Sequence, residues 1–449
     1  MRRRESRLKR SRTQIGRMWR ALAHDTRLRL ALEFTLLALA LVVMRRISVA
    51  IWRLPNGDVV EYHTYALAFW TQHPLFHAFP TEYPPLAILP FTTTLLPPLT
   101  DFQSVFTYWM GALVLLGYAG YLRFSDRKRA LAYFIYMVVG AAATVVTRFD
   151  IVPALVTLAA LWAAQRRHFA GAYILLALGV LLKLYPIFLV PLVAIEQWRA
   201  LVTPADSTLM VASPLIHWPA GRRVTMRAIL GEGWHAALHF WRTRVFWRVI
   251  EGMTFCLGVV ALGFVVTLIL NPVGALSGFQ YAGDRPLQVE STPATLLWLG
   301  TLFGIPAQPV FSFVSLNYVG PLDVILKPLS AVALVIGCLW TYWRLACGRL
   351  TLAQSFLGCL AAVIVTNKIF SPQYLIWIIP FVAEVEGLNL AWLLVCALTT
   401  TIFPYLYGLR KPVWTVTFGW EFMPAVALRN LLLVYVTIRS LLRRPLSAT

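Results

Sequence analysis

The chain has few charged residues for its length. Only 13% of its 449 residues are charged, 59% are hydrophobic, and the mean hydropathy is +0.68. This composition leaves too little polar surface to cover a soluble globule of this size. Apolar runs long enough to cross a hydrocarbon core of about 30 Å recur from end to end. The sequence therefore predicts an all-α polytopic integral membrane protein.

Three further features are scarce or missing. The chain has 5 cysteines, all in or beside apolar runs, and their spacing indicates neither a disulfide framework nor a zinc site. Internal repeats and low-complexity linkers are absent, which favours a single membrane domain. No small-residue cleavage site follows the first apolar run, so we expect that run to remain as an anchor.

Acidic residues are also few, 19 against 40 basic ones, and the net charge is +21. The arginines form blocks between apolar runs, which indicates membrane orientation rather than nucleic-acid binding. The leader 1–28 is strongly basic, so we expect the N-terminus in the cytoplasm. Further cytoplasmic markers are the blocks 123–129, 166–168, 199–248, 344–349 and 439–444.

Whether the Pro-rich run 83–98 crosses the membrane decides on which side the later segments lie. If it crossed the membrane fully, the basic blocks 123–129 and 166–168 would lie outside, against the charge bias. We therefore predict a half-helix that dips in from the outer face. The other expected spans lie near 29–47, 102–122, 130–147, 151–165, 169–196 (a helix pair broken near Lys183), 253–271, 326–343, 351–366, 372–386, 389–408 and 422–440.

These spans predict a bundle of about 11–13 transmembrane helices. The chain then consists of the leader 1–28, a single membrane domain at 29–440 and a cytoplasmic tail at 441–449. Within the membrane domain we expect an outer loop with an interfacial helix at 50–82, a basic cytoplasmic loop on anionic lipid at 197–250, and an outer region at 272–325. Several acidic residues then fall on the outer side, namely Asp58, Glu61, Glu82, Asp150, Asp284 and Glu290. We expect a polar site at the outer face.

The first candidate segment is 55–65, a turn followed by a helical pattern. Asp58, Glu61, Tyr62, Tyr65 and Phe69 share one face at about 100° per residue. A carboxylate here could accept the proton of an attacking sugar hydroxyl, and the tyrosines could stack on sugar rings. The alternative is structural: Asp58 as a helix N-cap with Glu61 as its capping-box partner, and the aromatics as an interfacial belt.

Three charged residues lie between or within apolar runs. Arg148 could contact a phosphate, and Asp150 could orient a sugar or hold a cation. The alternative is that Asp150 caps the following helix and pairs with Arg148. Lys183 lies inside a span, where a lysine is costly unless it reaches water or a partner; the alternative is a snorkelling anchor.

Two later segments, 283–291 and 366–374, each supply a cation and an amide. Arg285 and Lys368 suit a phosphate, while Gln288, Gln373 and Tyr374 suit sugar hydroxyls. Ordinary solvent-exposed loops are the alternative for both segments.

The order of these motifs resembles a known class. The acidic loop after the first span, Tyr83-Pro84-Pro85-Leu86, Arg148-Phe149-Asp150, Lys183-Leu184-Tyr185-Pro186 and Ser371-Pro372-Gln373-Tyr374 together look like the GT-C superfamily of membrane glycosyltransferases. The nearest likeness is to bacterial glycosyltransferase family 87, which includes polyprenol-phosphate-mannose-dependent α-mannosyltransferases. The likeness spans about residues 50 to 380.

The resemblance implies a GT-C-like fold, a polyprenyl-phosphate sugar as donor, a lipid or glycan acceptor in the cell envelope, and inversion at the anomeric carbon. Asp58 would be the general base, with Glu61 as the fallback; mannose is a family-level expectation. It also implies substrate-binding roles for Tyr62, Arg148, Asp150, Lys183, Tyr185, Arg285, Gln288, Glu290, Lys368, Gln373 and Tyr374. The family's acidic pair is not spelled Asp-Asp or Asp-x-Asp here, so no divalent cation or other cofactor is indicated.

Two other classes stay open at this point. A secondary transporter or lipid flippase would have structural repeats and charges near the membrane midplane. Lys183 and the broken helices favour it, but repeats are not visible. A non-catalytic scaffold would not need polar residues gathered at one face. We expect a multi-pass plasma-membrane protein with its site on the outer face.

Overall fold

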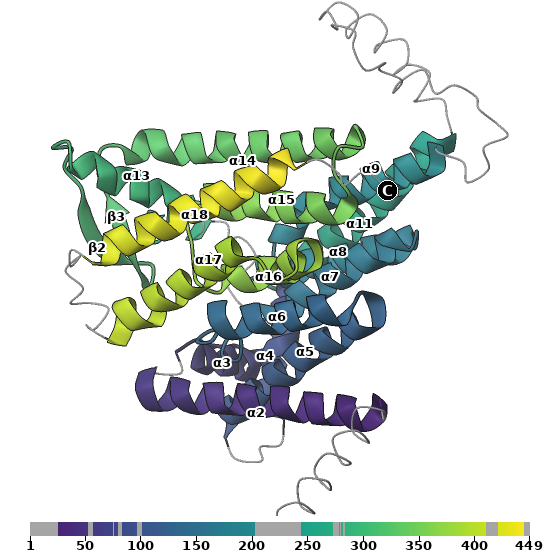
Figure 1. The fold of residues 1–449 in the computed structure, drawn as a ribbon, viewed down its shortest axis with the longest axis horizontal. Coiled ribbons are helices and arrows are strands. Elements are labelled where there is room, and N and C mark those ends of the chain that lie inside the picture. Colours follow the sequence, from purple (N-terminus) through teal and green to yellow (C-terminus); the bar gives the residue numbers. More distant parts are fainter. Residues whose placement is uncertain are drawn as a thin grey trace, which may run out of the picture.

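A computed structural model describes residues 26–52, 57–74, 76–79, 83–96, 101–202, 244–272, 278, 280–281, 283–409 and 421–443. Almost all of this part is helical (Figure 1). The helices are α2 (Thr26–Trp52), α3 (Gly57–Thr71), α4 (Ile88–Thr92), α5 (Phe102–Phe124), α6 (Arg127–Gly140), α7 (Ile151–Gln165), α8 (Phe169–Leu182), α9 (Val190–Val202), α11 (Arg244–Leu270), α13 (Thr292–Thr301), α14 (Asp323–Ala346), α15 (Leu352–Thr366), α16 (Tyr374–Glu386), α17 (Leu390–Thr400) and α18 (Phe422–Leu442). Short 3-10 segments are η1 (Pro85–Ala87), η2 (Thr93–Leu95) and η3 (Tyr185–Leu189), and a π-helix, η4 (Thr401–Leu409), continues α17.

Within the described residues, five helical segments are long and apolar enough to cross a membrane, and five shorter apolar helices accompany them. The long segments are Phe102–Phe124, Tyr185–Val202, Phe246–Leu270, Asp323–Ala346 and Phe422–Leu442. Only 11% of the most apolar 18 residues of α11 and of α14 are buried inside the protein, the lowest share among the five long segments, so these two helices leave the most apolar surface for lipid. The prediction of an all-α polytopic membrane protein is confirmed.

The short helices at 85–95 are the segment predicted to dip in and not cross. An 11-residue helix is about 17 Å long, well short of a hydrocarbon core of about 30 Å. Pro85 and Pro90 are buried there against the helix bundle. Residues 97 and 98 of the predicted half-helix lie outside the described residues, as do Glu82, residues 1–25, most of the loop 197–250 and the end of the tail.

One expected helix is shorter than predicted. The sequence favoured a span over 130–147, but α6 ends at Gly140 and residues 141–150 form consecutive turns. A side chain at Gly140 would meet Cys396 of α17 at 2.6 Å, so the two helices pack closely at this point. The turns bring Arg148 and Asp150 to the beginning of α7.

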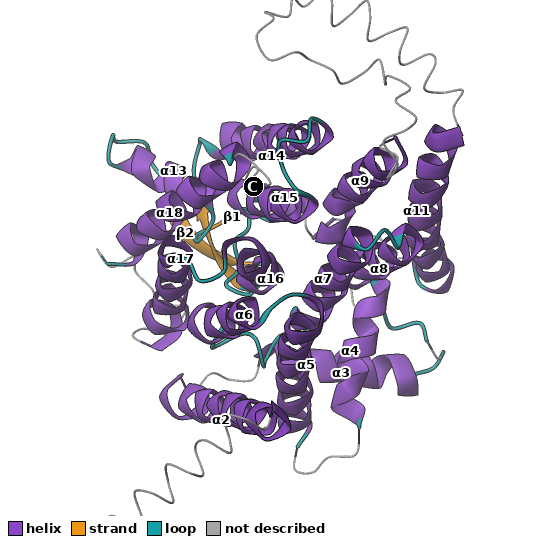
Figure 2. Ribbon diagram, turned by 45° about the vertical axis from the view of Figure 1, so that its right-hand side comes forward, coloured by secondary structure: helices purple, strands orange, loops and turns teal. Residues whose placement is uncertain are grey.

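The predicted outer region 272–325 contains strands that the sequence analysis did not anticipate. β1 (Leu287–Gln288), β2 (Gln308–Ser312) and β3 (Ser315–Val319) form an antiparallel sheet in the order β1-β3-β2 (Figure 2). Leu287 pairs with Tyr318, and Ser312 pairs with Ser315. Strands of two to five residues carry too little alternation to be read from sequence. Apolar side chains of the sheet pack on α13 and α18.

Arginines gather with carboxylates where α16 and α18 end and α6 begins. Arg129 pairs with Glu384 (Nη1–Oε1 3.4 Å), and Arg443 pairs with Glu386 (Nη1–Oε1 2.6 Å). Arg344, at the end of α14, donates to the carbonyl of Arg443. The basic blocks 123–129, 344–349 and 439–444 therefore share one end of the bundle.

Candidate active site

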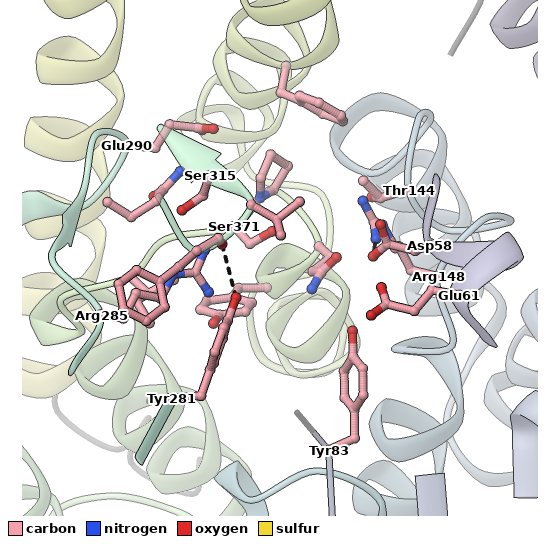
Figure 3. A pocket seen from close by; sticks show the side chains of 18 residues that line it. Asp58, Glu61, Tyr83, Thr144, Arg148, Tyr281, Arg285, Glu290, Ser315 and Ser371 are labelled. Carbon is pink, nitrogen blue, oxygen red and sulfur yellow. Dashed lines mark hydrogen bonds and ion pairs between the residues drawn. The ribbon is translucent and has the colours of Figure 1, made fainter. Parts of the chain in front are cut away.

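A polar cavity of about 210 Å³ lies at the opposite end, where α16 begins. Two groups of side chains face each other across it (Figure 3). Asp58, Glu61, Thr144 and Arg148 come from α3 and the turns before α7, while Tyr281, Arg285, Glu290, Ser315 and Ser371 come from the segments around the small sheet and α16. The other lining residues are Tyr83, Gln288, Phe313, Val314, Ile369, Pro372, Gln373, Tyr374 and Phe403.

Helix α3 supplies the two carboxylates of the first group. It begins at Gly57, so Asp58 lies inside the first turn and Glu61 follows one turn later. These bounds place Asp58 within the helix, directly after its first residue. The side chains of Val59, Tyr62 and Ala66 are buried. Burial of these neighbours fixes the rotation of the helix, and that rotation turns the carboxylates toward the cavity.

Tyr62 lies beneath the cavity and does not line it. Its side chain is fully buried, and its ring stacks on Phe91 at 4.1 Å between centroids and meets Tyr83 and Phe149 edge to face. Tyr83 lines the cavity from this aromatic cluster. Tyr62 thus supports the wall that Tyr83 presents.

Arg148 forms an ion pair with Asp58. Desolvation lowers the pKa of Arg148 to about 10, and the nearby charge of Asp150 partly offsets this effect. The guanidinium therefore stays protonated at neutral pH. Asp58 therefore lies beside a fixed cation at the edge of the cavity.

A second ion pair lies buried behind the first. Lys183 Nζ is 2.9 Å from Asp150 Oδ1, and Trp377 Nε1 donates to the same oxygen at 2.6 Å. Lys183 also lies 4.7 to 5.5 Å from the ring centroids of Phe149, Tyr83 and Trp377. Asp150 makes no side-chain capping bond, so the alternative that it caps α7 is wrong, as is its pairing with Arg148, which pairs with Asp58. Neither Asp150 nor Lys183 lines the cavity.

Three aromatic rings stack behind the side of the cavity that carries Tyr374. Trp377 lies between Tyr185, at 4.6 Å, and Tyr374, at 3.9 Å, with the planes inclined by 13° and 23°. Tyr374 reaches the cavity, whereas Tyr185 is buried and its hydroxyl lies 3.3 Å from Thr157 Oγ1. The stack therefore links the cavity wall to the buried Asp150–Lys183 pair through Trp377.

The two predicted loop segments, 283–291 and 366–374, are joined on the side of the cavity opposite α3, called the far wall below. The side chain of Gln288 accepts through Oε1 from the backbone N–H of Phe370 at 3.1 Å. The backbone N–H of Gln288 donates to the carbonyl of Lys368 at 3.0 Å. Lys368 Nζ donates to the carbonyl of Gly283 at 2.7 Å and does not line the cavity. Desolvation, with Lys327 and Arg285 nearby, lowers the pKa of Lys368. These bonds hold the two loops against each other and present Arg285 and Gln373 to the cavity.

Glu290 is the most buried carboxylate of the cavity wall, with 1% exposure. Arg429 of α18, itself fully buried, lies 3.6 Å away (Nη1–Oε2) and donates through Nη2 to the Glu290 carbonyl at 2.6 Å. The same guanidinium lies over Phe370 at 3.8 Å from the centroid. Sequence analysis missed Arg429, although a charge inside an apolar run is itself a signal of this kind.

Burial raises the pKa of Glu290 to about 7, against the opposing effect of Arg429. The folded protein thus holds this proton more tightly than the unfolded chain, whose value is near 4.5. The stabilisation is complete at low pH and is lost as pH rises from about 4.5 to 7, by up to about 3 kcal/mol. We expect the Glu290→Gln variant to show a flatter dependence of Tm on pH over this range. Parallel curves for both proteins would contradict the assignment.

Eight predicted residues line the cavity together: Asp58, Glu61, Arg148, Arg285, Gln288, Glu290, Gln373 and Tyr374. Tyr62, Asp150, Lys183, Tyr185 and Lys368 do not line it. Tyr83, Ser371 and Pro372 also line it and belong to the motifs that carry the resemblance. The other lining residues were not given a role, because aliphatic, aromatic and hydroxyl side chains outside a motif give no distinctive pattern. Among the described residues, no group of three or more His, Cys, Asp or Glu side chains could hold a metal ion.

Fold and cavity together define a polytopic membrane protein with a carboxylate-bearing and cation-bearing site between helix ends. Residues 81–223 match the family model of glycosyltransferase family 87. No curated protein and no solved structure matches the chain. Over these residues the match supports the resemblance drawn from the motifs, and the matched family is one of glycosyltransferases. It covers Tyr83, Arg148, Asp150 and Lys183, whereas Asp58, Glu61 and the far wall of the cavity lie outside it.

Proposed function

We propose that the protein transfers a hexose, mannose being the family-level expectation, from a polyprenyl-phosphate donor to a lipid-linked or envelope glycan acceptor. One observation carries this proposal. Asp58 and Glu61 lie across a polar cavity from Arg285, with Gln373 and Tyr374 lining the cavity between helix ends. A base, a cation for a phosphate and groups for sugar hydroxyls are what such a transfer requires.

The reaction is a single displacement. An acceptor hydroxyl oxygen attacks the anomeric carbon and its proton passes to Asp58. The bond from that carbon to the phosphate oxygen breaks, and its electron pair leaves with the polyprenyl phosphate. Attack opposite the leaving group inverts the anomeric configuration. Glu61 is the fallback base, because it lies one helical turn from Asp58 on the same wall.

Arg285 is suited to the departing phosphate. Its Nε is buried and has no hydrogen-bond partner among the described residues, and Lys368 and Lys327 add positive potential nearby. Arg148 and Lys183 are each paired with a carboxylate, Asp58 and Asp150, and Arg429 lies beside Glu290. Arg285 is therefore the cation of the far wall that an anionic leaving group can approach, with Lys368, Lys327 and the carboxylate of Asp284 nearby.

We place the cavity on the outer face of the plasma membrane. The basic blocks near Arg129, Arg344 and Arg443 gather at the other end of the bundle. Clusters of arginine at span ends are typical of the cytoplasmic side. The acceptor would therefore be met outside the cytoplasm.

The test is transfer by the purified full chain in liposomes. Radiolabelled polyprenyl-phosphate mannose and polyprenyl-phosphate glucose are compared with nucleotide sugars, with alkyl mannosides and alkyl glucosides as acceptors. We expect an inverted product from a polyprenyl-phosphate donor and none from a nucleotide sugar. Transfer from nucleotide sugars alone would contradict the donor class. Donor translocation across the bilayer without any glycoside product would favour a flippase instead.

A further inference from the structure

The turn between β2 and β3 has an unusual backbone for its sequence. Phe313 and Val314 are its two central residues, with φ of 54° and 51°, and the flanking Ser312 and Ser315 pair across the ladder. Two-residue hairpin loops with positive φ at both positions favour Asn-Gly, because most side chains crowd the backbone there. A β-branched residue such as valine is especially disfavoured in this region.

The surroundings hold this turn in place. Tyr281 donates its hydroxyl to the Phe313 carbonyl at 2.9 Å, and the two rings lie 5.3 Å apart. Asn317, fully buried, donates through Nδ2 to the carbonyl of Ser312 at 2.7 Å. The conformation is thus imposed by neighbouring groups, and persists although its own residues disfavour it.

Core packing does not account for Val314, and it accounts for only part of Phe313. Val314 is 86% exposed. Both residues line the cavity, where most other lining side chains are polar. An exposed apolar side chain such as Val314 on a disfavoured turn costs stability without contributing to the core, so a contact outside the folded chain is the remaining physical reason to have it there. Phe313 is half-buried beside Tyr281 and shows the rest of its ring to the cavity.

We infer that the Phe313–Val314 turn is a substrate-binding element, an apolar rim that contacts the donor; the inference rests on the proposed function. Phe313 offers an aromatic face, and Val314 extends the apolar surface at the cavity edge. Two parts of the donor present apolar hydrogens to such a rim: the C–H face of the sugar ring and the first isoprene unit. The contact fixes the donor between the carboxylates of α3 and Arg285.

The decisive variant is Phe313→Asn with Val314→Gly. It introduces the turn sequence that this backbone favours and removes both apolar side chains. We expect an unchanged or higher Tm together with a KM for the donor raised about tenfold. Phe311→Asn is the matched control, since Phe311 is exposed one position before Ser312 and does not line the cavity; its KM should stay at the wild-type value. A merely structural turn would give the opposite pattern in Tm and no change in KM.

Donor length separates the two sources of the contact. A mannosyl phosphate that carries a polyprenol is compared with one that carries only a methyl group: an equal rise in KM for both assigns the contact to the sugar, and a rise for the polyprenyl donor alone assigns it to the first isoprene unit. Wild-type KM in the double variant for both donors would overturn the inference.

If the double variant does not fold, the single variants Val314→Gly and Phe313→Tyr replace it. KM should rise for the first and stay near wild type for the second, and equal KM values in both would overturn the inference. Failure of the wild-type protein to transfer sugar contradicts the proposed function. If the wild type transfers sugar and the turn variants do so with the same KM for the donor, only the role of the turn is contradicted.

Discussion

Replacing Asp58 by Asn is expected to lower sugar transfer by about 10²–10⁴-fold, the range for loss of a general base. The amide keeps the shape of the side chain but cannot take the proton of the attacking hydroxyl. Transfer is measured with the polyprenyl-phosphate donor that the wild type uses, and Tm is measured on the same preparation. Asp58 and Arg148 are both partly exposed, with 28% and 21% of the side chain accessible, so loss of the ion pair should change stability little.

Two controls make this prediction specific. Asp101→Asn removes a carboxylate that caps α5 and does not line the cavity; since Asn is an equally good cap, both activity and Tm should be retained. Glu61→Gln separates the two candidates on α3. Full activity in Asp58→Asn combined with loss in Glu61→Gln would move the base to Glu61, and full activity in both variants would exclude a carboxylate base on α3.

Replacing Lys183 by Met is expected to destabilise the protein by about 3–5 kcal/mol, because it leaves a buried carboxylate without its cation. Asp150 is fully buried, its Oδ1 is 2.9 Å from the lysine Nζ, and its Oδ2 has no hydrogen-bond partner in the described part of the chain. Asp150→Asn should be destabilising too, since it leaves the buried Lys183 cation without its carboxylate, although the amide oxygen can still accept from Trp377. Tm and the yield of monodisperse protein report the effect.

The double variant tests whether the pair acts as a unit. Lys183→Met combined with Asp150→Asn should lose less stability than the sum of the single changes, by the coupling energy of a close pair. Lys128→Met is the control, because Lys128 is exposed at the beginning of α6 and its replacement should change stability by about 0.5 kcal/mol or less. Additive effects, or an unchanged Tm in Lys183→Met, would return the lysine to the role of a snorkelling anchor.

Composition and order of motifs determined several features of this protein. Membrane residence follows from hydrophobicity, because lipid must cover what polar side chains cannot. Helix ends such as Ile151 and the break at Lys183 were readable, since polar residues and proline interrupt apolar runs there. The motifs that include Tyr83, Arg148 and Lys183 resembled the family whose model matches this part of the chain.

Only the tertiary structure decided which charges meet. Residues far apart in sequence are brought together at the cavity, as with Asp58 and Arg148, or are buried behind it, as with Asp150 and Lys183. Periodicity along a helix specifies a face but not its partner, so Tyr62 was placed on the right face of α3 and packs in an aromatic cluster. The role of Arg429 depends on packing against Glu290, more than a hundred residues away in the sequence. The Phe313–Val314 turn depends on two short strands, which local patterns do not encode.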